Sequence, residues 1–192
     1  METYYLVNEI FSSLQGEGAR SGQPATFVRF SGCNLDCPFC DTDHQRHTRL
    51  TADAIVAVMM CHTPRYAVLT GGEPALQADA NLLQAMKRAG YTIAIETNGT
   101  LPLPDGIDWI TVSPKEGKQA VLTHADELKV VYIGQDVERY YAGIKAQHHY
   151  LQPCSTLRNG VLHDNREEVI AYCMEHPHWS LSLQMHKILG IR

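Results

Sequence analysis

The stretch that decides the fold is Ser31-Gly32-Cys33-Asn34-Leu35-Asp36-Cys37-Pro38-Phe39-Cys40-Asp41, in which three cysteines are separated by three and then two residues. No fourth cysteine follows closely. A [4Fe–4S] cluster that is held by protein alone takes four thiolates. Three thiolates would leave one iron open, so the loop predicts a cluster that binds a substrate or cofactor directly.

A structural zinc site is the alternative interpretation of this loop. His44 or His47 would complete a Cys3His set, and spacing alone does not separate the two possibilities. Phe39 favours the cluster, because an aromatic ring beside the last thiol could cover a bound adenine. Asp41 and Thr42 add oxygen atoms next to it. This CxxxCxFC arrangement resembles the signature of radical S-adenosylmethionine (SAM) enzymes, in which the open iron binds the amino and carboxylate groups of SAM.

Composition places the chain among ordinary globular proteins. It has 192 residues, 44% of them hydrophobic and 19% charged, with a net charge of -5. The negative charge and the lack of a Lys/Arg cluster argue against nucleic acid as a partner. No apolar stretch approaches the roughly 20 residues that cross a bilayer, and residues 1–3 begin no signal peptide. We therefore expect no membrane partner and a cytoplasmic location.

The six cysteines fit this location, because reducing cytosol favours metal binding by the clustered three over disulfides. Cys61 and Cys173 lie in helical patterns and are expected to be small buried hydrophobic residues. Cys154 lies in one of the polar motifs that follow the predicted strands, so we expect it near the site.

Apolar β-rich runs alternate with amphipathic ones, and no repeat or linker marks a second domain. Strands are predicted at 25–30, 67–69, 92–96, 109–112, 127–131, 150–152 and 181–184, and helices at 52–61, 77–89, 136–145 and 165–175. Thr51 is the expected N-cap of the first helix, and Gly90 the expected end of the second. Because parallel strands need long right-handed crossovers, this alternation predicts a mainly parallel sheet with helices outside it.

A complete eight-unit barrel usually takes about 250 residues. We therefore predict a single domain over residues 1–192 with an α/β fold, a shortened and partly open (β/α) barrel in which some crossovers lack helices.

Polar motifs follow these strands directly. They are the cysteine loop, Thr70-Gly71-Gly72-Glu73-Pro74, Glu96-Thr97-Asn98-Gly99, Ser113-Pro114-Lys115, Gln152-Pro153-Cys154-Ser155 and Gln184-Met185-His186-Lys187. The carboxyl ends of parallel strands form the active face of a barrel. The motifs are therefore expected to meet at one site.

Together with Leu14-Gln15-Gly16-Glu17-Gly18 and Arg29, these motifs resemble the 7-carboxy-7-deazaguanine synthase family over nearly the whole chain. The resemblance implies that 6-carboxy-5,6,7,8-tetrahydropterin is converted to 7-carboxy-7-deazaguanine with loss of ammonia, in queuosine and deazapurine synthesis. It implies a [4Fe–4S] cluster, SAM as a regenerated cofactor that abstracts and returns the pterin C6 hydrogen, and Mg²⁺. It also implies a flavodoxin-like electron donor and a homodimer.

The resemblance assigns roles to individual residues. Cys33, Cys37 and Cys40 would hold the cluster, and Thr42 the Mg²⁺. The SAM contacts would be Phe39, Cys40, Asp41, Gly72, Ser113, Pro114, Lys115, Gln152, Pro153, Cys154 and Ser155. The pterin contacts would be Leu14, Gln15, Gly16, Glu17, Arg29, Thr70, His186 and the terminal carboxylate of Arg192.

Several of these residues also have plainer interpretations. Arg29 suits a carboxylate, because its planar fork donates two parallel hydrogen bonds, but it could equally form a salt bridge between strands. Lys115 could be a solvated surface charge, and His186 a structural histidine. Two other functions also remain open, namely another radical SAM enzyme such as a glycyl-radical activase, and a non-catalytic zinc or iron–sulfur module.

Overall fold

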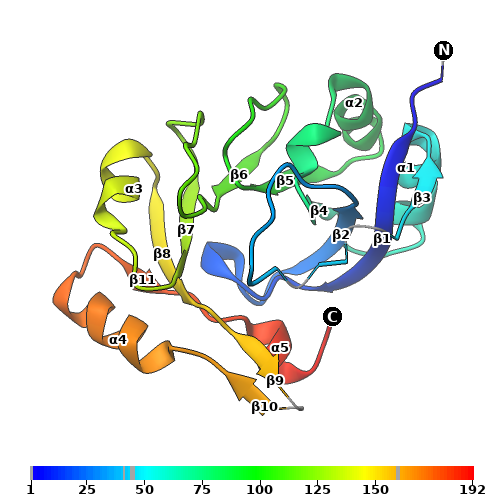
Figure 1. The fold of residues 1–192 in the computed structure, drawn as a ribbon. Coiled ribbons are helices and arrows are strands. Elements are labelled where there is room, and N and C mark those ends of the chain that lie inside the picture. The colour runs from blue at the N-terminus through cyan, green and yellow to red at the C-terminus, as the bar shows by residue number, and fades with distance from the viewer. Residues whose placement is uncertain (1, 41, 44–45, 159–160) are drawn as a thin grey trace.

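The computed structural model contains a nine-stranded open sheet (Figure 1). The structure describes residues 2–40, 42–43, 46–158 and 161–192, but not the side chains at 156–158 and 161–163. The strands of the sheet are β1 (Tyr5–Leu14), β2 (Pro24–Phe30), β3 (Thr48–Leu50), β4 (Tyr66–Gly71), β5 (Thr92–Thr97), β6 (Trp109–Val112), β7 (Glu127–Tyr132), β8 (His148–Pro153) and β11 (Ser180–Leu181). A separate hairpin joins β9 (Thr156–Arg158) and β10 (Val161–His163).

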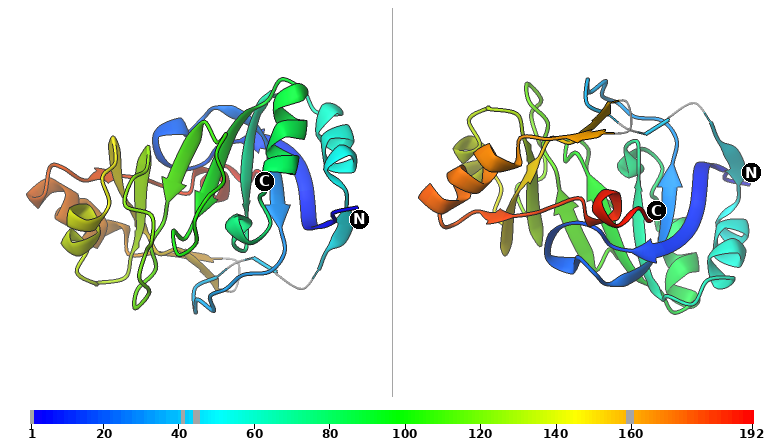
Figure 2. Two further views of the ribbon diagram at one scale, coloured as in Figure 1. Left: turned by 90° about the horizontal axis from the view of Figure 1, so that it is seen from above. Right: turned by 90° about the horizontal axis from the view of Figure 1, so that it is seen from below.

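The helices are α1 (Ala52–Met60), α2 (Ala80–Arg88), α3 (Glu138–Gly143), α4 (Arg166–Glu175) and α5 (Met185–Leu189), with short 3-10 turns η1 (Gly18–Arg20) and η2 (Pro74–Leu76). The strand order is β11-β8-β7-β6-β5-β4-β2-β1-β3. All pairs from β2 to β11 are parallel, whereas β1 pairs antiparallel with both β2 and β3. The sheet is curved, with α1 to α4 outside it (Figure 2). This confirms the predicted mainly parallel, partly open barrel.

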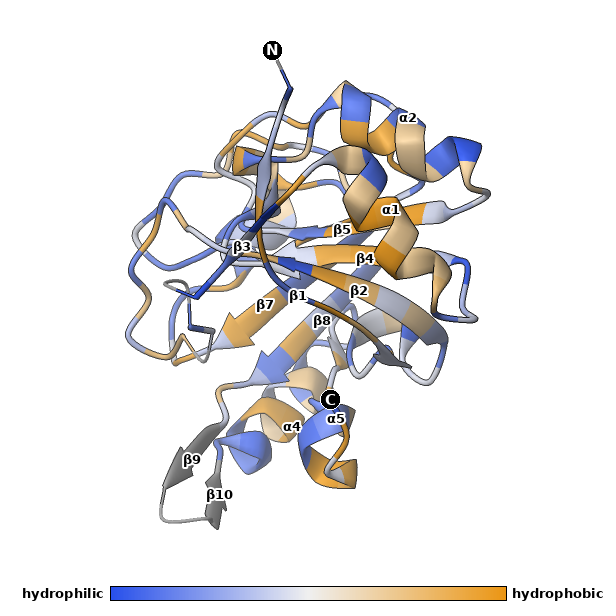
Figure 3. Ribbon diagram, turned by 90° about the vertical axis from the view of Figure 1, so that its right-hand side faces the viewer, coloured by the Kyte–Doolittle hydropathy of each residue, from blue (hydrophilic) through white to orange (hydrophobic). Residues whose placement is uncertain are grey.

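Side chains alternate between the two faces of the sheet, as successive residues of a strand must. On the outer face Val28, Leu69 and Ile95 pack against α1 and α2 in one core. A second core joins β7 and β8 to α3 and α4. The strand β4 and the helix α1 are predominantly apolar (Figure 3). Burying these helices against the sheet fixes the strand ends relative to one another.

The inner face changes character along each strand. Near the amino ends it is apolar, and Phe27, Val68 and Ala94 form a third core there. Two residues further along come Arg29 on β2, Thr70 on β4 and Glu96 on β5. The sheet therefore places its polar inward side chains at the carboxyl ends of the parallel strands.

Several predicted boundaries are confirmed. The strand at 109–112 matches β6, and the Thr51 side chain caps α1 by accepting from Ala54 N at 3.2 Å. Gly90 follows α2 with φ +82°, a conformation that favours glycine. The predicted helix at 77–89 begins later, at Ala80, because the Asp79 side chain caps that turn by accepting from Leu82 N at 2.9 Å.

Other predictions were wrong or incomplete. The strand β1, next to the edge strand β3, was not predicted, and a register shift between Val7 and Glu9 breaks its alternation. The predicted strand at 181–184 is reduced to Ser180–Leu181, since Gln184 turns into the N-cap of α5. Cys61 is exposed at the end of α1, which corrects its predicted burial, whereas Cys173 packs partly buried against the second core.

In the described ranges, no helix has both the length and the apolar character that crossing a membrane requires.

Candidate active site

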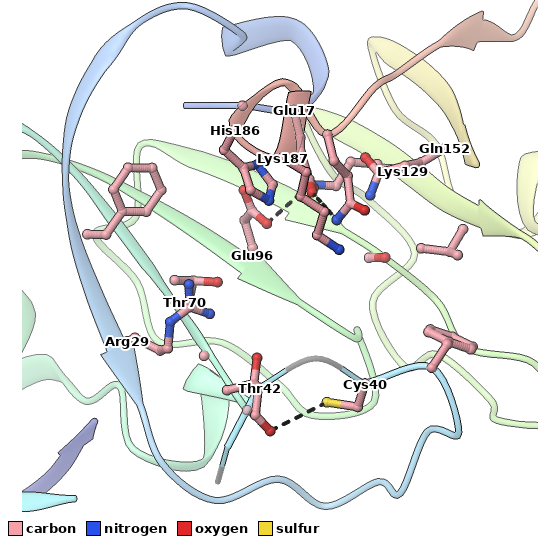
Figure 4. Close-up of a pocket in the computed structure, with 18 of the residues that line it drawn as sticks. Glu17, Arg29, Cys40, Thr42, Thr70, Glu96, Lys129, Gln152, His186 and Lys187 are labelled. Carbon is pink, nitrogen blue, oxygen red and sulfur yellow. Dashed lines mark hydrogen bonds and ion pairs between the residues drawn. The ribbon is translucent and has the colours of Figure 1, made fainter. Parts of the chain in front are cut away.

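A cavity of about 530 Å³ opens at the carboxyl ends of the parallel strands (Figure 4). The sequence-predicted residues that line it are Leu14, Gln15, Gly16, Glu17, Arg29, Cys33, Cys37, Phe39, Cys40, Thr42, Thr70, Gly72, Ser113, Lys115, Gln152, Pro153, Cys154, Ser155, His186 and Arg192. Pro114 is buried and is not among the lining residues. Asp41 and His44 lie outside the described residues. The polar strand ends therefore converge on one space.

The cysteine loop forms one wall of this cavity and is tied to the neighbouring strand ends. Asn34 donates to Thr100 Oγ1 at 2.8 Å and its side-chain oxygen accepts from Asn98 Nδ2 at 3.0 Å. The backbone amide of Glu73 donates to Gly32 O at 2.9 Å. These bonds hold the loop over the ends of β4 and β5.

The three thiols suit a cluster better than a single ion. Cys33, Cys37 and Cys40 all line the cavity, and they interact electrostatically. No group of three His, Cys, Asp or Glu side chains in the described ranges is arranged to hold one metal ion. A cubane offers each thiolate its own iron, so its ligands need not converge on one point. A Cys3His zinc site that uses His47 therefore does not fit this arrangement.

Burial raises the pKa of Cys37, while the neighbouring Lys115 opposes that shift. Burial likewise lowers the pKa of Lys115, and Cys37 opposes it in turn. The Lys115 ammonium donates to Ser113 Oγ at 2.7 Å. Lys115 thus places a positive group beside the cysteine loop, where an anion would bind.

The glycine motif after β4 has a conformational reason. Gly71 has φ +119°, and a Cβ there would lie 2.2 Å from the Phe30 carbonyl oxygen. Only glycine fits. Glu73, 1% exposed, accepts from Thr97 Oγ1 at 2.6 Å and from the Asn98 amide at 2.7 Å. The motif therefore joins two strand ends and leaves the backbone of Gly72 at the cavity.

Arg29 and Thr70 form a second wall, and they are register partners in the parallel pair β2–β4. Arg29 Nε donates to Glu9 Oε1 at 2.9 Å, so the strand salt bridge considered from the sequence is present. The terminal nitrogens of Arg29 make no hydrogen bond with another described residue. The guanidinium is therefore oriented through Nε and still presents its two terminal nitrogens.

A buried ionic network forms the third wall. The Lys129 ammonium lies 2.5 Å from Glu17 Oε2 and 3.2 Å from Glu96 Oε2. Burial raises the pKa of Glu17, but the ion pair with Lys129 outweighs it and lowers that pKa to about 2. Burial disfavours charge on Lys129, yet the surrounding carboxylates raise its pKa. Both partners are therefore charged at neutral pH.

The C-terminal segment closes the cavity. The Met185 amide donates to Gly16 O at 3.0 Å, and a Cβ on Gly16 would lie 2.4 Å from His186 Nδ1. The Ser13 hydroxyl donates to the Arg192 carbonyl, and the Arg192 side chain pairs with Glu9. Residues at both ends of the chain thus line one site.

The predicted sites missed Glu9 and Lys129, both of which line the cavity, and named Glu96 in a strand-end motif without giving it a role. A pattern in the sequence does point to Lys129 as a site residue. Glu127 and Lys129 are charged residues two positions apart in an otherwise apolar strand, so they share one face. No sequence pattern points to Glu9 as a site residue, because its strand was not predicted.

Comparison with known proteins agrees with this geometry. The Radical SAM superfamily model matches residues 27–174. A 7-carboxy-7-deazaguanine synthase from Bacteroides thetaiotaomicron is 49% identical over 186 residues, covering 97% of this chain and 98% of that protein. One from Bordetella pertussis is 44% identical over 210 residues, with 97% and 99% covered. The crystal structure of QueE from Escherichia coli matches with a TM-score of 0.77 and 27% identity, covering 95% of each chain.

These similarities extend over nearly the whole of each chain. The chain therefore belongs to the 7-carboxy-7-deazaguanine synthase family, within the radical SAM superfamily.

Proposed function

We propose that this protein converts 6-carboxy-5,6,7,8-tetrahydropterin to 7-carboxy-7-deazaguanine and ammonia, as a radical SAM lyase of 7-deazapurine synthesis. The near-full-length similarity to 7-carboxy-7-deazaguanine synthases carries the proposal. The site supports it, because one cavity combines the three cysteines of the loop, Arg29 and a row of hydrogen-bond acceptors. Substrate and products have the same atoms, so the reaction needs no net oxidant.

Cys33, Cys37 and Cys40 would hold the [4Fe–4S] cluster. When bound, the cluster and SAM supply a carbon-centred radical that abstracts and later returns the C6 hydrogen. The chain's own part is to position SAM. Lys115 would pair with the SAM carboxylate, Phe39 would cover the adenine, and the Gly72 backbone would approach the amino group.

SAM contacts would continue with Cys40, Asp41, Ser113, Pro114, Gln152, Pro153, Cys154 and Ser155. Gln152 already has a fixed orientation, because its side-chain oxygen accepts from Ser182 Oγ at 3.1 Å. SAM would thus lie between the cysteine loop and the ends of β6 and β8.

The pterin would bind between Arg29 and Glu17. The two terminal nitrogens of Arg29 would grip the substrate carboxylate, and Thr70 would contact the ring beside them. Glu17 would accept from the N–H groups of the aminopyrimidinone edge. Leu14, Gln15 and Gly16 would frame the ring, and His186 and Arg192 would complete the pocket.

Thr42 would bind Mg²⁺ through its hydroxyl. Thr42, Arg29 and Thr70 line the same cavity, so a substrate carboxylate could reach both the ion and the guanidinium (Figure 4). A neutral hydroxyl is a weak ligand on its own, and Mg²⁺ requires an octahedron of oxygens. The ion should therefore bind together with substrate and align its carboxylate.

The remaining parts of the proposal concern the whole protein. Residues 1–192 would act as a single domain, as a homodimer, with a flavodoxin-like protein as electron donor and no nucleic acid or membrane partner. None of the six cysteines is in a disulfide in the described part of the chain, which supports a reducing compartment, hence the cytoplasm.

Anaerobic incubation of the reconstituted protein with SAM, reductant, Mg²⁺ and the carboxypterin tests the proposal. Formation of carboxydeazaguanine together with ammonia is the expected result. Unchanged pterin, under conditions in which SAM is still cleaved, would contradict it and favour a glycyl-radical activase. Absence of SAM cleavage with any substrate would favour a binding module instead.

A further inference from the structure

Lys129 bridges two carboxylates that line the cavity but belong to different segments. Its ammonium, on the inner face of β7, contacts Glu17 from the loop after β1 and Glu96 at the end of β5 (Figure 4). Lys129 is 3% exposed. A single buried cation therefore sets the separation of two acceptors that the chain brings from far apart.

Each of these carboxylates has a second donor on its other oxygen. Glu17 Oε1 accepts from Gln184 Nε2 at 2.9 Å, and Glu96 Oε1 accepts from Gln15 Nε2 at 2.8 Å. The lysine and the two amides together fix the plane and the direction of both carboxylates. A ring that docks against them would meet oxygens already in place, which lowers the entropic cost of binding.

The charges around Lys129 are predominantly negative. The charged or titratable groups that face it or its partners are Glu17, Glu96, Glu127, Lys115 and His186. Glu127, on the same face of β7, has its pKa raised by burial and also accepts from the Ala19 amide at 2.8 Å. This wall therefore suits a ligand edge that is rich in N–H donors.

We propose that Lys129 is a positioning residue that holds Glu17 and Glu96 as fixed, charged acceptors for the N–H donors of the pterin's aminopyrimidinone edge. The inference rests on the proposed function. Lys129 itself offers only donors, so it serves this edge through the carboxylates and not by direct contact.

Loss of the lysine charge would change how the carboxylates respond to pH. Without the cation, burial and mutual repulsion favour protonation of one of them. A protonated carboxyl donates where the pterin edge needs an acceptor, so substrate affinity would fall as pH falls. In the wild type, Glu17 has a pKa of about 2 and keeps its charge throughout the neutral range.

The test measures Kd for the carboxypterin, anaerobically and without reductant, on cluster-loaded protein with SAM at about pH 6.5 and 8.5. Wild type should show nearly equal Kd values. Lys129→Met should bind about tenfold more weakly at the lower pH, since one proton linked to binding costs up to a factor of ten per pH unit. Lys87→Met is the control, because Lys87 pairs with Asp108 outside the cavity.

Equal loss of affinity at both pH values would mean a merely structural role and would overturn the inference, as would unchanged affinity. Because Lys129→Met leaves two carboxylates without their cation, which destabilises the fold, Lys129→Met combined with Glu17→Gln is also compared with Glu17→Gln alone. The ratio of Kd at pH 6.5 to Kd at pH 8.5 should be larger in the double variant than in Glu17→Gln, because Glu96 has lost its cation. Equal ratios would refute the inference. Wild-type protein that neither binds nor converts the pterin would refute the proposed function instead.

Discussion

Glu9 and Arg29 face each other across the antiparallel pair β1–β2, and Arg29 Nε donates to Glu9 Oε1 at 2.9 Å. This ion pair orients the guanidinium toward the cavity and leaves its terminal nitrogens to a ligand. The strand salt bridge and the carboxylate-binding role are therefore compatible, because they use different nitrogens of one side chain.

Arg29→Lys should keep the positive charge and lose the planar guanidinium that donates two parallel hydrogen bonds. We expect KM for the carboxypterin to rise about 10- to 100-fold, because one charge-assisted hydrogen bond contributes about 1.5–3 kcal/mol. Glu9→Gln, which removes the charge that pairs with Arg29 and Arg192 but keeps the Arg29 fork, should have a smaller effect. Arg65→Lys, outside the cavity, is the control. Steady-state kinetics check this, and an unchanged KM in Arg29→Lys would exclude the contact.

Replacement of single cysteines should separate cluster ligands from bystanders. Cys37→Ser should lose most iron and the brown colour after anaerobic reconstitution, because a cluster that lacks one of three ligands is poorly held. Cys154 lines the same cavity and Cys61 is exposed, but neither is a proposed cluster ligand. Cys154→Ser and Cys61→Ser should therefore both retain about four irons per chain. Iron and sulfide analysis checks this. Equal loss in Cys154→Ser, or retention of zinc alone, would contradict the ligand assignment.

Thr42→Ala should abolish the stimulation of turnover by Mg²⁺ while the iron content stays unchanged. The hydroxyl is the protein's proposed contribution to the ion, and without it the substrate carboxylate alone must hold the metal. Thr48→Ala, an exposed position on β3, should behave as wild type. A Mg²⁺ titration of turnover measures the effect. A full response in Thr42→Ala would place the ion elsewhere.

The Glu17–Lys129 pair should make stability depend on acid pH in a defined direction. The pKa of Glu17 falls from 4.5 to about 2 in the folded chain. Its contribution, about 3 kcal/mol, is therefore complete above pH 4.5 and disappears as pH falls through 2. Urea unfolding of wild type and Glu17→Gln across this range measures it.

Glu127 provides the contrast for that experiment. Burial raises its pKa, so relative to Glu127→Gln the wild type should become less stable as pH rises through the folded pKa. If the differences in unfolding free energy for the two variants had the same sign of pH dependence, the ionic arrangement around Lys129 would be wrong.

Much of the fold followed from local patterns in the sequence. Buried parallel strands such as β4 and β5 are short apolar runs between turn signals, and Thr51 and Gly90 marked helix ends by their own chemistry. The strand β1 was missed, because its register shift breaks the alternation on which strand prediction depends. Exposure of Cys61 depends on which side of α1 faces the sheet, which its apolar sequence left open.

The candidate site was predicted where residues follow strand ends, because parallel topology gathers those ends. Lys129 and Glu9 lie within strands, and their contacts depend on pairing between distant segments. The Lys129–Glu17 contact joins residues 112 positions apart. Such a contact has no local signature, so it required the structure.

The ratio of carboxydeazaguanine formed to SAM consumed tests the central claim most directly. Because substrate and products have the same atoms, a regenerated SAM predicts many product molecules per SAM in an anaerobic, Mg²⁺-containing reaction. A SAM that is cleaved to 5′-deoxyadenosine while the carboxypterin stays unchanged would contradict the claim.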